Sequence, residues 1–209
     1  MDTYLYGCGG HSKVILDILH HQGRLIKAFV DDNPPEMLHS IHGTPIIHSQ
    51  VLSQITVDSS LWIVGIGNNR NRKTIVEKLK NQGHSFTSAI HPSAQIGLGV
   101  EIGVGTVVMA NAVVNIDTVL GDHVIINTGA TIDHDCNIGD YCHVAPGSNV
   151  SGHVKLGNSV LLGVGTHVSS CVEIGDNTTC GAGSVVIRSI DGNCLAYGCP
   201  AKVVEVLPP

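Results

Sequence analysis

The sequence is poor in aromatic and charged residues and has no long apolar run. Aromatic residues make up 3% and charged residues 13% of its 209 positions, whereas 43% are hydrophobic. Aliphatic and small side chains must therefore build most of the core. No apolar run approaches the roughly 18 residues that a membrane helix needs, and the N-terminus lacks the basic and apolar regions of a signal peptide. We expect a cytoplasmic protein without a membrane span.

The chain also lacks any cluster of basic residues. Its 11 Lys and Arg residues against 17 Asp and Glu residues give a formal net charge of −6 with neutral histidines. Basic and aromatic residues are not interleaved as they are in nucleic-acid interfaces, so we expect no nucleic-acid partner. The seven cysteines contain no Cys-x-x-Cys pair, and an odd number leaves at least one thiol unpaired. We expect them to be buried, reduced thiols.

A six-residue repeat runs through the second half of the chain. An aliphatic residue, in one case replaced by Cys180, stands at every sixth position from Ile96 to Val186. We call these positions the aliphatic ladder. Gly often follows a ladder residue, and a small or β-branched residue stands four positions after it. Because six is not a multiple of the helical period of 3.6, an amphipathic helix does not explain the pattern.

The repeat predicts a solenoid of short strands. Each unit supplies one strand and one turn, with Gly or Asn providing the unusual turn dihedrals. Three units make a coil of 18 residues, and strands of successive coils pair in parallel roughly 4.8 Å apart. The units follow one another without interruption between residues 96 and 191, so functional groups must lie on the outside of the prism.

The first ninety residues predict a small parallel α/β domain. Strands are expected over residues 3–7 and 26–30, separated by the loop Gly7–His11 and a helix. The apolar face of that helix is formed by Val14, Ile15, Ile18 and Leu19. Glycines at such a turn allow backbone N–H groups to approach a phosphate. Because Ser12 replaces the third glycine of GxGxxG, the turn alone is weak evidence for a nucleotide site and is somewhat better explained as a tight structural turn.

A second strand-turn-helix unit follows. Residues 61–66 predict another buried strand, which runs into the glycine-rich turn 65–70. The helix after this turn is expected to bury Ile75, Val76 and Leu79. The two glycine-rich turns then lie at the same end of the sheet, where open α/β sheets bind ligands.

These motifs together resemble a known family over essentially the whole chain. The segments that carry the resemblance are YGCGGHSKV at 6–14, VDD at 30–32, GIGNNRNRK at 65–73, IHPSA at 90–94, INTGATIDHDCNIGDYCHVAPG at 126–147 and YGCPAK at 197–202. They are similar to those of the acetyl-CoA-dependent N-acetyltransferases of nucleotide-linked 4-amino-4,6-dideoxy sugars. These enzymes belong to the hexapeptide-repeat acyltransferases and serve glycan biosynthesis.

The resemblance implies a Rossmann-like domain over residues 1–90 and a left-handed parallel β-helix over 91–209. It further implies a homotrimer with active sites between neighbouring prisms, acetyl-CoA as co-substrate and no metal. His134 in the His134–Asp135 pair is expected to be the catalytic base. His143 is expected near the thioester, and the Gly152 N–H is expected to face the acetyl carbonyl.

The same resemblance implies where the sugar nucleotide binds. Asn127 is associated with the sugar pocket, and the nucleotide contacts are expected at Gly9, Gly10, His11, Asp31, Asp32, Asn68, Asn69 and Arg70. Lys202 is a candidate contact of a CoA phosphate, although an exposed lysine near the C-terminus is nearly as well explained without a ligand. UDP is the favoured nucleotide because GIGNNRNRK and VDD look most like enzymes that make N-acetylated bacillosamine precursors.

The coil length gives independent support for part of this assignment. Gly152 follows His134 by one coil length, so it is expected one coil above His134 in the same column. By the same spacing, Asp117, Asp135 and His153 form a neighbouring column of ionisable groups, which are frequent at functional sites. Asp135 is a candidate to orient His134, although neighbouring residues of a strand point to opposite sides.

Three alternative functions remain open at this point. A histidine base serves a hydroxyl as well as an amine, so an O-acetyltransferase of a sugar or of sialic acid is the nearest alternative. A zinc enzyme of the carbonic anhydrase type needs three histidines around the metal. His134, His143 and His153 have unsuitable spacings for such a set. A non-catalytic scaffold is the third alternative.

Overall fold

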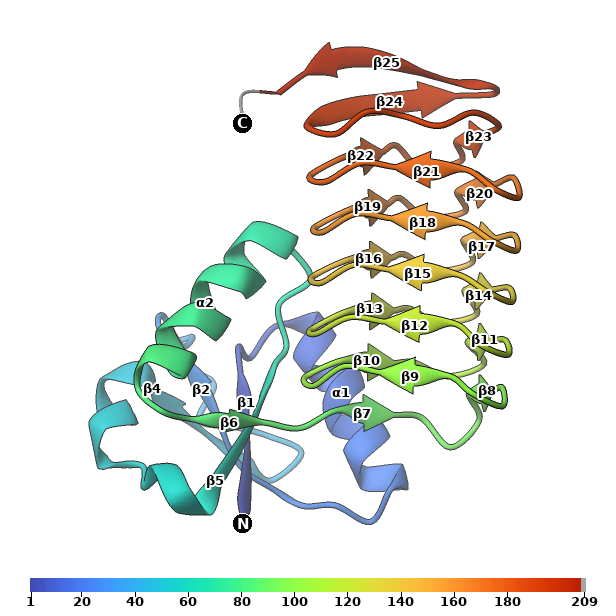
Figure 1. Cartoon of the computed structure of the whole chain (residues 1–209). Coiled ribbons are helices and arrows are strands. Elements are labelled where there is room, and N and C mark those ends of the chain that lie inside the picture. The colour runs from blue at the N-terminus through green and yellow to red at the C-terminus, as the bar shows by residue number, and fades with distance from the viewer. Residues whose placement is uncertain (208–209) are drawn as a thin grey trace.

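The computed structural model describes residues 1–207 of the chain. The N-terminal part of the chain contains a single six-stranded sheet (Figure 1). The strands lie in the order β3-β4-β2-β1-β5-β6, and all neighbours are parallel except the β3–β4 hairpin. Their bounds are β1 Asp2–Tyr6, β2 Ile26–Asp31, β3 Ser40–Ile41, β4 Thr44–His48, β5 Ser60–Val64 and β6 Ser85–Phe86. Helices α1 (Gly10–His21) and α2 (Asn69–Asn81) and two 3-10 turns (Ser49–Gln54 and Val57–Ser59) complete this unit. The predicted α/β domain is confirmed.

Strand β1 is the point at which the order of the sheet reverses. It pairs with β2 on one side and with β5 on the other. The loops that follow β1 and β5 therefore open side by side at the carboxyl edge of the sheet, as in other open α/β sheets. Both glycine-rich turns lie in these loops.

The second part of the chain is a parallel β-helix with left-handed coils (Figure 1). Its strands are β7 Ala89–Ile90, β8 Gln95–Ile96, β9 Glu101–Ile102, β10 Val107–Val108, β11 Val113–Val114, β12 Val119–Leu120, β13 Ile125–Ile126, β14 Thr131–Ile132, β15 Asn137–Ile138, β16 His143–Val144, β17 Asn149–Val150, β18 Lys155–Leu156, β19 Leu161–Leu162, β20 His167–Val168, β21 Glu173–Ile174, β22 Thr179–Cys180 and β23 Val185–Val186. Each pairs with the equivalent strand of the next coil, as Val107 does with Ile125. The hairpin of β24 (Cys194–Gly198) and β25 (Ala201–Val206) closes the far end.

The strands form three faces of a prism. The first face contains β7, β10, β13, β16, β19 and β22 with the closing hairpin; the second contains β8, β11, β14, β17, β20 and β23; the third contains β9, β12, β15, β18 and β21. Every strand from β8 to β23 ends on a residue of the aliphatic ladder. From Val108 onward these residues are buried, whereas Ile96 at the open end is 38% exposed.

A second set of inward side chains satisfies polar backbone groups of the turns. Residues four positions after the ladder are small, and their hydroxyl or thiol groups donate to carbonyl oxygens one coil further along. Examples are Thr118 Oγ1 to Asp133 O at 2.8 Å, Cys142 Sγ to Gly157 O at 2.9 Å and Ser148 Oγ to Gly163 O at 2.9 Å. The expectation of buried cysteines holds for five of the seven, but Cys171 and Cys199 are exposed; all seven are free.

The N-terminal unit packs against the first face of the prism. One hydrophobic cluster joins α1 and the sheet, through Ile15 and Leu19, to Val107 and Ile125 of the prism. The expectation that Val14 lies on this buried side is wrong, because it is 40% exposed and Ser12 is buried in its place. The chain passes from one sheet to the other between β6 and β7, and the division into two domains at residue 90 stays a prediction. No helix within residues 1–207 is long and apolar enough to cross a membrane.

The second inward set generates a test of stability. In Thr118→Val the shape of the side chain is kept, but Asp133 O loses its donor and the Cys136 amide, 3.2 Å from Thr118 Oγ1, loses its acceptor. We expect the free energy of unfolding to fall by about 1–3 kcal/mol, because both groups remain buried and unpaired. Urea denaturation measures this change. Thr118→Ser keeps the hydroxyl and is the control; equal losses in both variants would contradict the role assigned to it.

Candidate active site

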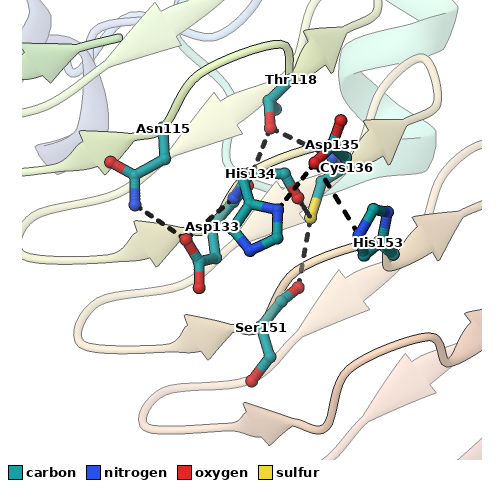
Figure 2. A network of polar contacts seen from close by, with 8 residues as sticks. All are labelled: Asn115, Thr118, Asp133, His134, Asp135, Cys136, Ser151 and His153. Carbon is teal, nitrogen blue, oxygen red and sulfur yellow. Dashed lines mark hydrogen bonds and ion pairs between the residues drawn. The ribbon is translucent and has the colours of Figure 1, made fainter.

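His134 and Asp135 lie in the turn between β14 and β15, at the edge where the second and third faces meet. Asp135 has a φ of +57°, in the left-handed region, as do Asp117 (+59°) and His153 (+58°) in the adjacent coils. Because the pair sits in a turn rather than in a strand, the two side chains meet: His134 Nδ1 lies 2.7 Å from Asp135 Oδ2 (Figure 2). The expectation that these neighbours point apart is wrong for this reason.

The Asp135 carboxylate determines how the His134 ring is protonated. Its hydrogen bond favours the imidazolium form and raises the pKa of His134 above its ordinary value, with smaller contributions from the charges of Asp133 and Asp135. In the neutral ring Nδ1 carries the proton that Asp135 accepts, so Nε2 has a free lone pair. This is the tautomer in which Nε2 serves as a proton acceptor.

Asp133 fixes the backbone of the same turn, a role that the sequence analysis missed. Its Oδ1 accepts from the His134 amide and from Asn115 Nδ2, each at 2.9 Å (Figure 2). These two hydrogen bonds hold the pKa of Asp133 below its ordinary value. Asn115 precedes Asp133 by one coil length, so the coil spacing was the signal that links them.

The predicted stacking of Gly152 on His134 is confirmed. A Cβ on Gly152 would lie 2.7 Å from Cε1 and 2.8 Å from Nε2 of His134, so only glycine leaves room for the ring. Within residues 1–207 the Gly152 N–H has no hydrogen-bond partner, whereas the amides on either side of it pair with Val168 O and His134 O. The edge therefore presents a lone pair and a free N–H donor next to each other.

His153 lies beside His134 and Asp135, whereas His143 does not. The His153 ring centroid is 5.1 Å from that of His134, with the rings nearly perpendicular, and its Nε2 is 3.8 Å from Asp135 Oδ2. His143 belongs to β16 on the first face. The three histidines weighed for a zinc enzyme of the carbonic anhydrase type are thus not brought together in one chain.

His143 instead connects the prism to the N-terminal unit. Its Nδ1 is 3.1 Å from Gly67 O, and its Nε2 is 3.0 Å from Asn127 Nδ2. Burial lowers the pKa of His143 to about 4, with a further contribution from the charge of Arg72. The ring is therefore neutral near pH 7, donates from Nδ1 to Gly67 and accepts from Asn127 at Nε2. Burial likewise lowers the pKa of His11 to about 4.

A pocket of about 340 Å³ lies where β1 and β5 end. It is lined by Tyr6, Gly7, Gly9, Gly10, His11, Asp31, Asp32, Gly65, Ile66 and Gly67. Ser12 explains the departure from GxGxxG, because its hydroxyl donates a hydrogen bond to Gly65 O at 3.0 Å. The Ser12 Cβ also lies so close to Gly65 that a Cβ added to Gly65 would be only 3.0 Å from it. Helix α1 thus begins in close contact with the end of β5, and its first amides face the pocket.

The two acids of this pocket are held by protein donors. Asp31 accepts from the Cys8 amide and the Asn33 amide, each at 2.9 Å. Asp32 accepts from Ser49 Oγ at 2.6 Å and from Tyr6 Oη at 2.8 Å. Partial burial works against the charged form of Asp32, but the hydrogen bonds outweigh burial and lower its pKa.

A larger groove of about 920 Å³ runs from the start of α2 along the first face of the prism. Asn68 caps α2 by accepting from the Asn71 amide at 3.0 Å, and Asn69 Nδ2 donates to Ser159 O at 3.1 Å. Arg70 lines the groove together with His143. Lys202 is exposed on β25 in the closing hairpin, away from both cavities.

Arg72 is a second residue that the sequence analysis missed. Although only 1% exposed, its guanidinium donates to His123 O, Ile66 O, Gly67 O, Asn69 Oδ1, Tyr141 O and Cys142 O. Burial lowers its pKa to about 10, so it keeps its charge near pH 7. An arginine among apolar helix positions was the available signal, but the carbonyl groups that it binds come from distant segments.

Comparisons with known proteins agree with this architecture. The PglD N-terminal domain matches residues 2–79, and the model of the bacterial transferase hexapeptide (six repeats) matches residues 117–152. PerB from Caulobacter crescentus, solved with CoA and GDP-perosamine, is 38% identical, with 98% of each chain covered and a TM-score of 0.92. The chain belongs to the acetyl-CoA-dependent N-acetyltransferases of nucleotide-linked amino sugars.

Two further members of this N-acetyltransferase family are similar. The acetyltransferase domain of PglB from Neisseria gonorrhoeae, solved with acetyl coenzyme A, is 34% identical, with 97% of this chain and 98% of that chain covered and a TM-score of 0.89. UDP-N-acetylbacillosamine N-acetyltransferase from Bacillus subtilis is 34% identical over 112 residues, which are 51% of this chain and 50% of that relative. The match thus spans about half the length of this curated relative.

The contact between His134 and Asp135 generates a test of the electrostatics. In Asp135→Asn the carboxylate that stabilises the imidazolium is lost, so we expect the pKa of His134 to fall. An NMR titration of the histidine ring resonances measures it. Asp117→Asn, in the same column one coil below, is the matched control and should leave the pKa of His134 in place. Equal shifts in the two variants would show that the field of the column, and not the hydrogen bond, raises the pKa.

Proposed function

We propose that the chain transfers the acetyl group of acetyl-CoA to the 4-amino group of a nucleotide-linked 4-amino-4,6-dideoxy sugar. The observation that carries this proposal is the edge at which the His134 ring lies against Gly152, whose N–H has no hydrogen-bond partner within residues 1–207. UDP is our choice of nucleotide because of the likeness to the bacillosamine enzymes. The solved relative from C. crescentus was bound to GDP-perosamine, so GDP is the alternative that the assay must include.

The proposed transfer is direct. The sugar ammonium first loses one proton to solvent. The neutral nitrogen then attacks the thioester carbon, and His134 Nε2 accepts a second proton from the attacking nitrogen. The Gly152 N–H donates to the carbonyl oxygen as it gains negative charge. The carbon–sulfur bond then breaks, and the CoA thiolate takes the proton from the imidazolium. Two structures of the C. crescentus enzyme carry Asn or Ala in place of one histidine, which agrees with a functional histidine in the family.

We infer that the complete site needs two copies of the chain, in a homotrimer. His134 lies between the second and third faces, whereas the N-terminal unit packs on the first face and on the turns that lead into it (Figure 1). A sugar nucleotide held at the ends of β1 and β5 therefore faces away from His134 of its own chain. Packing the His134 edge of one copy against the groove beside His143 of the next brings the two parts together.

The ligand contacts follow from the two cavities. Amides of Gly9, Gly10 and His11 at the start of α1 suit a diphosphate, and Asp31 and Asp32 suit donors of the sugar or base. Asn68, Asn69 and Arg70 extend this surface toward the groove, in which Asn127 and His143 bind the sugar or the thioester end of acetyl-CoA. Asp135 orients the base.

Two cations of the prism suit the phosphates of CoA. The prism has only three basic residues, and Lys155 is paired with Glu173 at 2.7 Å. Arg188 and Lys202 have no ion-pair partner within residues 1–207. Arg188 follows His134 by three coil lengths, so it stands above it in the same column. We assign both residues to CoA binding.

The replacement of His134 tests the chemistry. In His134→Ala the proton acceptor is lost while the nucleotide pocket is untouched. We expect turnover to fall by about 10²–10⁴-fold, the usual contribution of a general base, with nearly unchanged affinity for the sugar nucleotide. Release of the CoA thiol, measured with UDP-, dTDP- and GDP-linked 4-amino-6-deoxy sugars, gives turnover, and calorimetry gives affinity. Turnover close to wild type would remove His134 from the reaction, and a preference for a hydroxyl acceptor would indicate O-acetylation.

Cys142→Ala should stay active, because direct transfer needs no thiol.

A mixture of two inactive variants tests the shared site. In Gly10→Asp the added side chain fits, since a Cβ there meets nothing within 4 Å, but its charge repels a diphosphate. Neither this variant nor His134→Ala should be active alone. Trimers assembled from both should recover activity, with about a quarter of the sites intact if subunits mix at random. Absence of recovery in mixed trimers of proven composition would place both parts of the site in one chain.

A further inference from the structure

The second imidazole beside the base has no role in the transfer as proposed. His134, Asp135 and His153 each offer one ligand atom, and these three atoms lie within 4.8 Å of one another. The side chains come from two consecutive coils, and Asp135 lies between the two rings (Figure 2). Two imidazoles and one carboxylate are the donor set of many zinc sites with an open position.

The separations suit a small divalent ion. Zinc binds imidazole nitrogen and carboxylate oxygen at about 2.0–2.2 Å, so donors around a tetrahedral ion stand roughly 3.4 Å apart. The present distances to Asp135 Oδ2, 2.7 Å from His134 Nδ1 and 3.8 Å from His153 Nε2, lie on either side of that value. Small side-chain rotations would bring the donor atoms to this separation. All three side chains are about half exposed, which leaves room for water as the fourth ligand.

The surroundings also favour a cation. Asp117 stands one coil below Asp135 in the same column, and Asp133 precedes His134. The basic residue nearest in sequence, Lys155, is already paired with Glu173. The ladder of paired strands holds the two coils in register, so the backbone positions of the three ligands are fixed before any ion arrives.

We propose that His134, Asp135 and His153 bind zinc and that the bound ion inhibits the enzyme. Zinc takes the lone pair of His134 Nδ1, so the proton of the neutral ring must reside on Nε2. The nitrogen next to the Gly152 amide is then a donor and no longer accepts a proton from the sugar amine. The inhibition rests on the proposed role of His134, whereas the binding does not.

A second histidine cluster provides a control. Asp17, His21 and His91 also lie close enough together for a shared ion. There, however, His91 Nδ1 is 3.0 Å from the Ser93 amide and 2.7 Å from Ser93 Oγ, and His21 Nδ1 is 2.9 Å from Asp17 O. Hydrogen bonds already occupy these nitrogens, so we expect weaker binding there.

Zinc titration of the intact protein tests the proposal. The variant is His153→Asn, because Asn adopts the left-handed conformation of this position more readily than most residues. We expect calorimetry to show zinc binding to wild type, and roughly tenfold or greater loss of affinity in His153→Asn. CoA-thiol release should be inhibited by zinc in wild type and should resist it in His153→Asn, with unchanged activity before zinc is added. Cobalt(II), followed by its visible absorption, reports histidine coordination independently of activity.

Two matched variants separate this site from others. His91→Gln alters the second cluster, and Cys171→Ser removes the exposed thiol one coil above His153; neither should change zinc affinity or inhibition. Equal zinc affinity in wild type and a folded His153→Asn would overturn the proposal. Zinc binding that depends on His153 but leaves turnover intact would overturn the inhibition and, with it, the role of His134 as base, while the metal site itself would stand.

Discussion

Parallel pairing between equivalent strands of successive coils is the constraint on which the site depends. Each coil repeats the turn below it, so every residue at the edge is stacked on the equivalent residue of the neighbouring coil. This is why the ring of His134 can lie against Gly152, where any Cβ would collide with it. Inward hydroxyl and thiol groups such as those of Thr118 and Cys136 preserve this register, because they bind turn carbonyl groups of the next coil. The geometry of the proposed catalytic edge is thus a property of the repeat and not of a flexible loop.

A buried cation fixes the other half of the site. Arg72 binds carbonyl groups from the loop after β5 and from two turns of the prism, and it has no carboxylate partner among residues 1–207. A charged donor left unpaired in the interior is strongly unfavourable, so these segments hold one another in place. Gly67 is among its acceptors and also accepts from His143. The pocket at the ends of β1 and β5, where we propose that the nucleotide binds, and the groove therefore keep a constant position relative to the prism.

Features that follow from the six-residue period can be predicted from the sequence, whereas contacts that depend on local backbone conformation or on distant segments cannot. The ladder, the coil and the stacking of Gly152 on His134 depend on a period that is visible in the residues themselves. The contact between His134 and Asp135 depends on the φ of +57° at Asp135, and the presence of an Asp in the sequence does not predict this conformation. Arg72 looks like one more charge on α2, because its acceptors on the prism lie 51 to 70 residues away. Helical spacing places Val14 inward, but the buried side of α1 carries Ser12, which packs against Gly65 at the end of β5.

Two adjacent columns of residues at the edge between the second and third faces have different roles in our proposal. One holds the groups that we propose to meet the reactants, His134 and Gly152. The next holds Asp135, which binds His134 Nδ1, and His153, which takes no part in the proposed transfer. Because Asp135 engages Nδ1, the lone pair of the neutral ring is on Nε2, one of the ring atoms closest to Gly152. The same division leaves Nδ1 within reach of a metal ion that His153 helps to bind. The hydrogen bond that we propose to orient His134 for proton transfer thus also brings together two of the three ligands of the proposed zinc site.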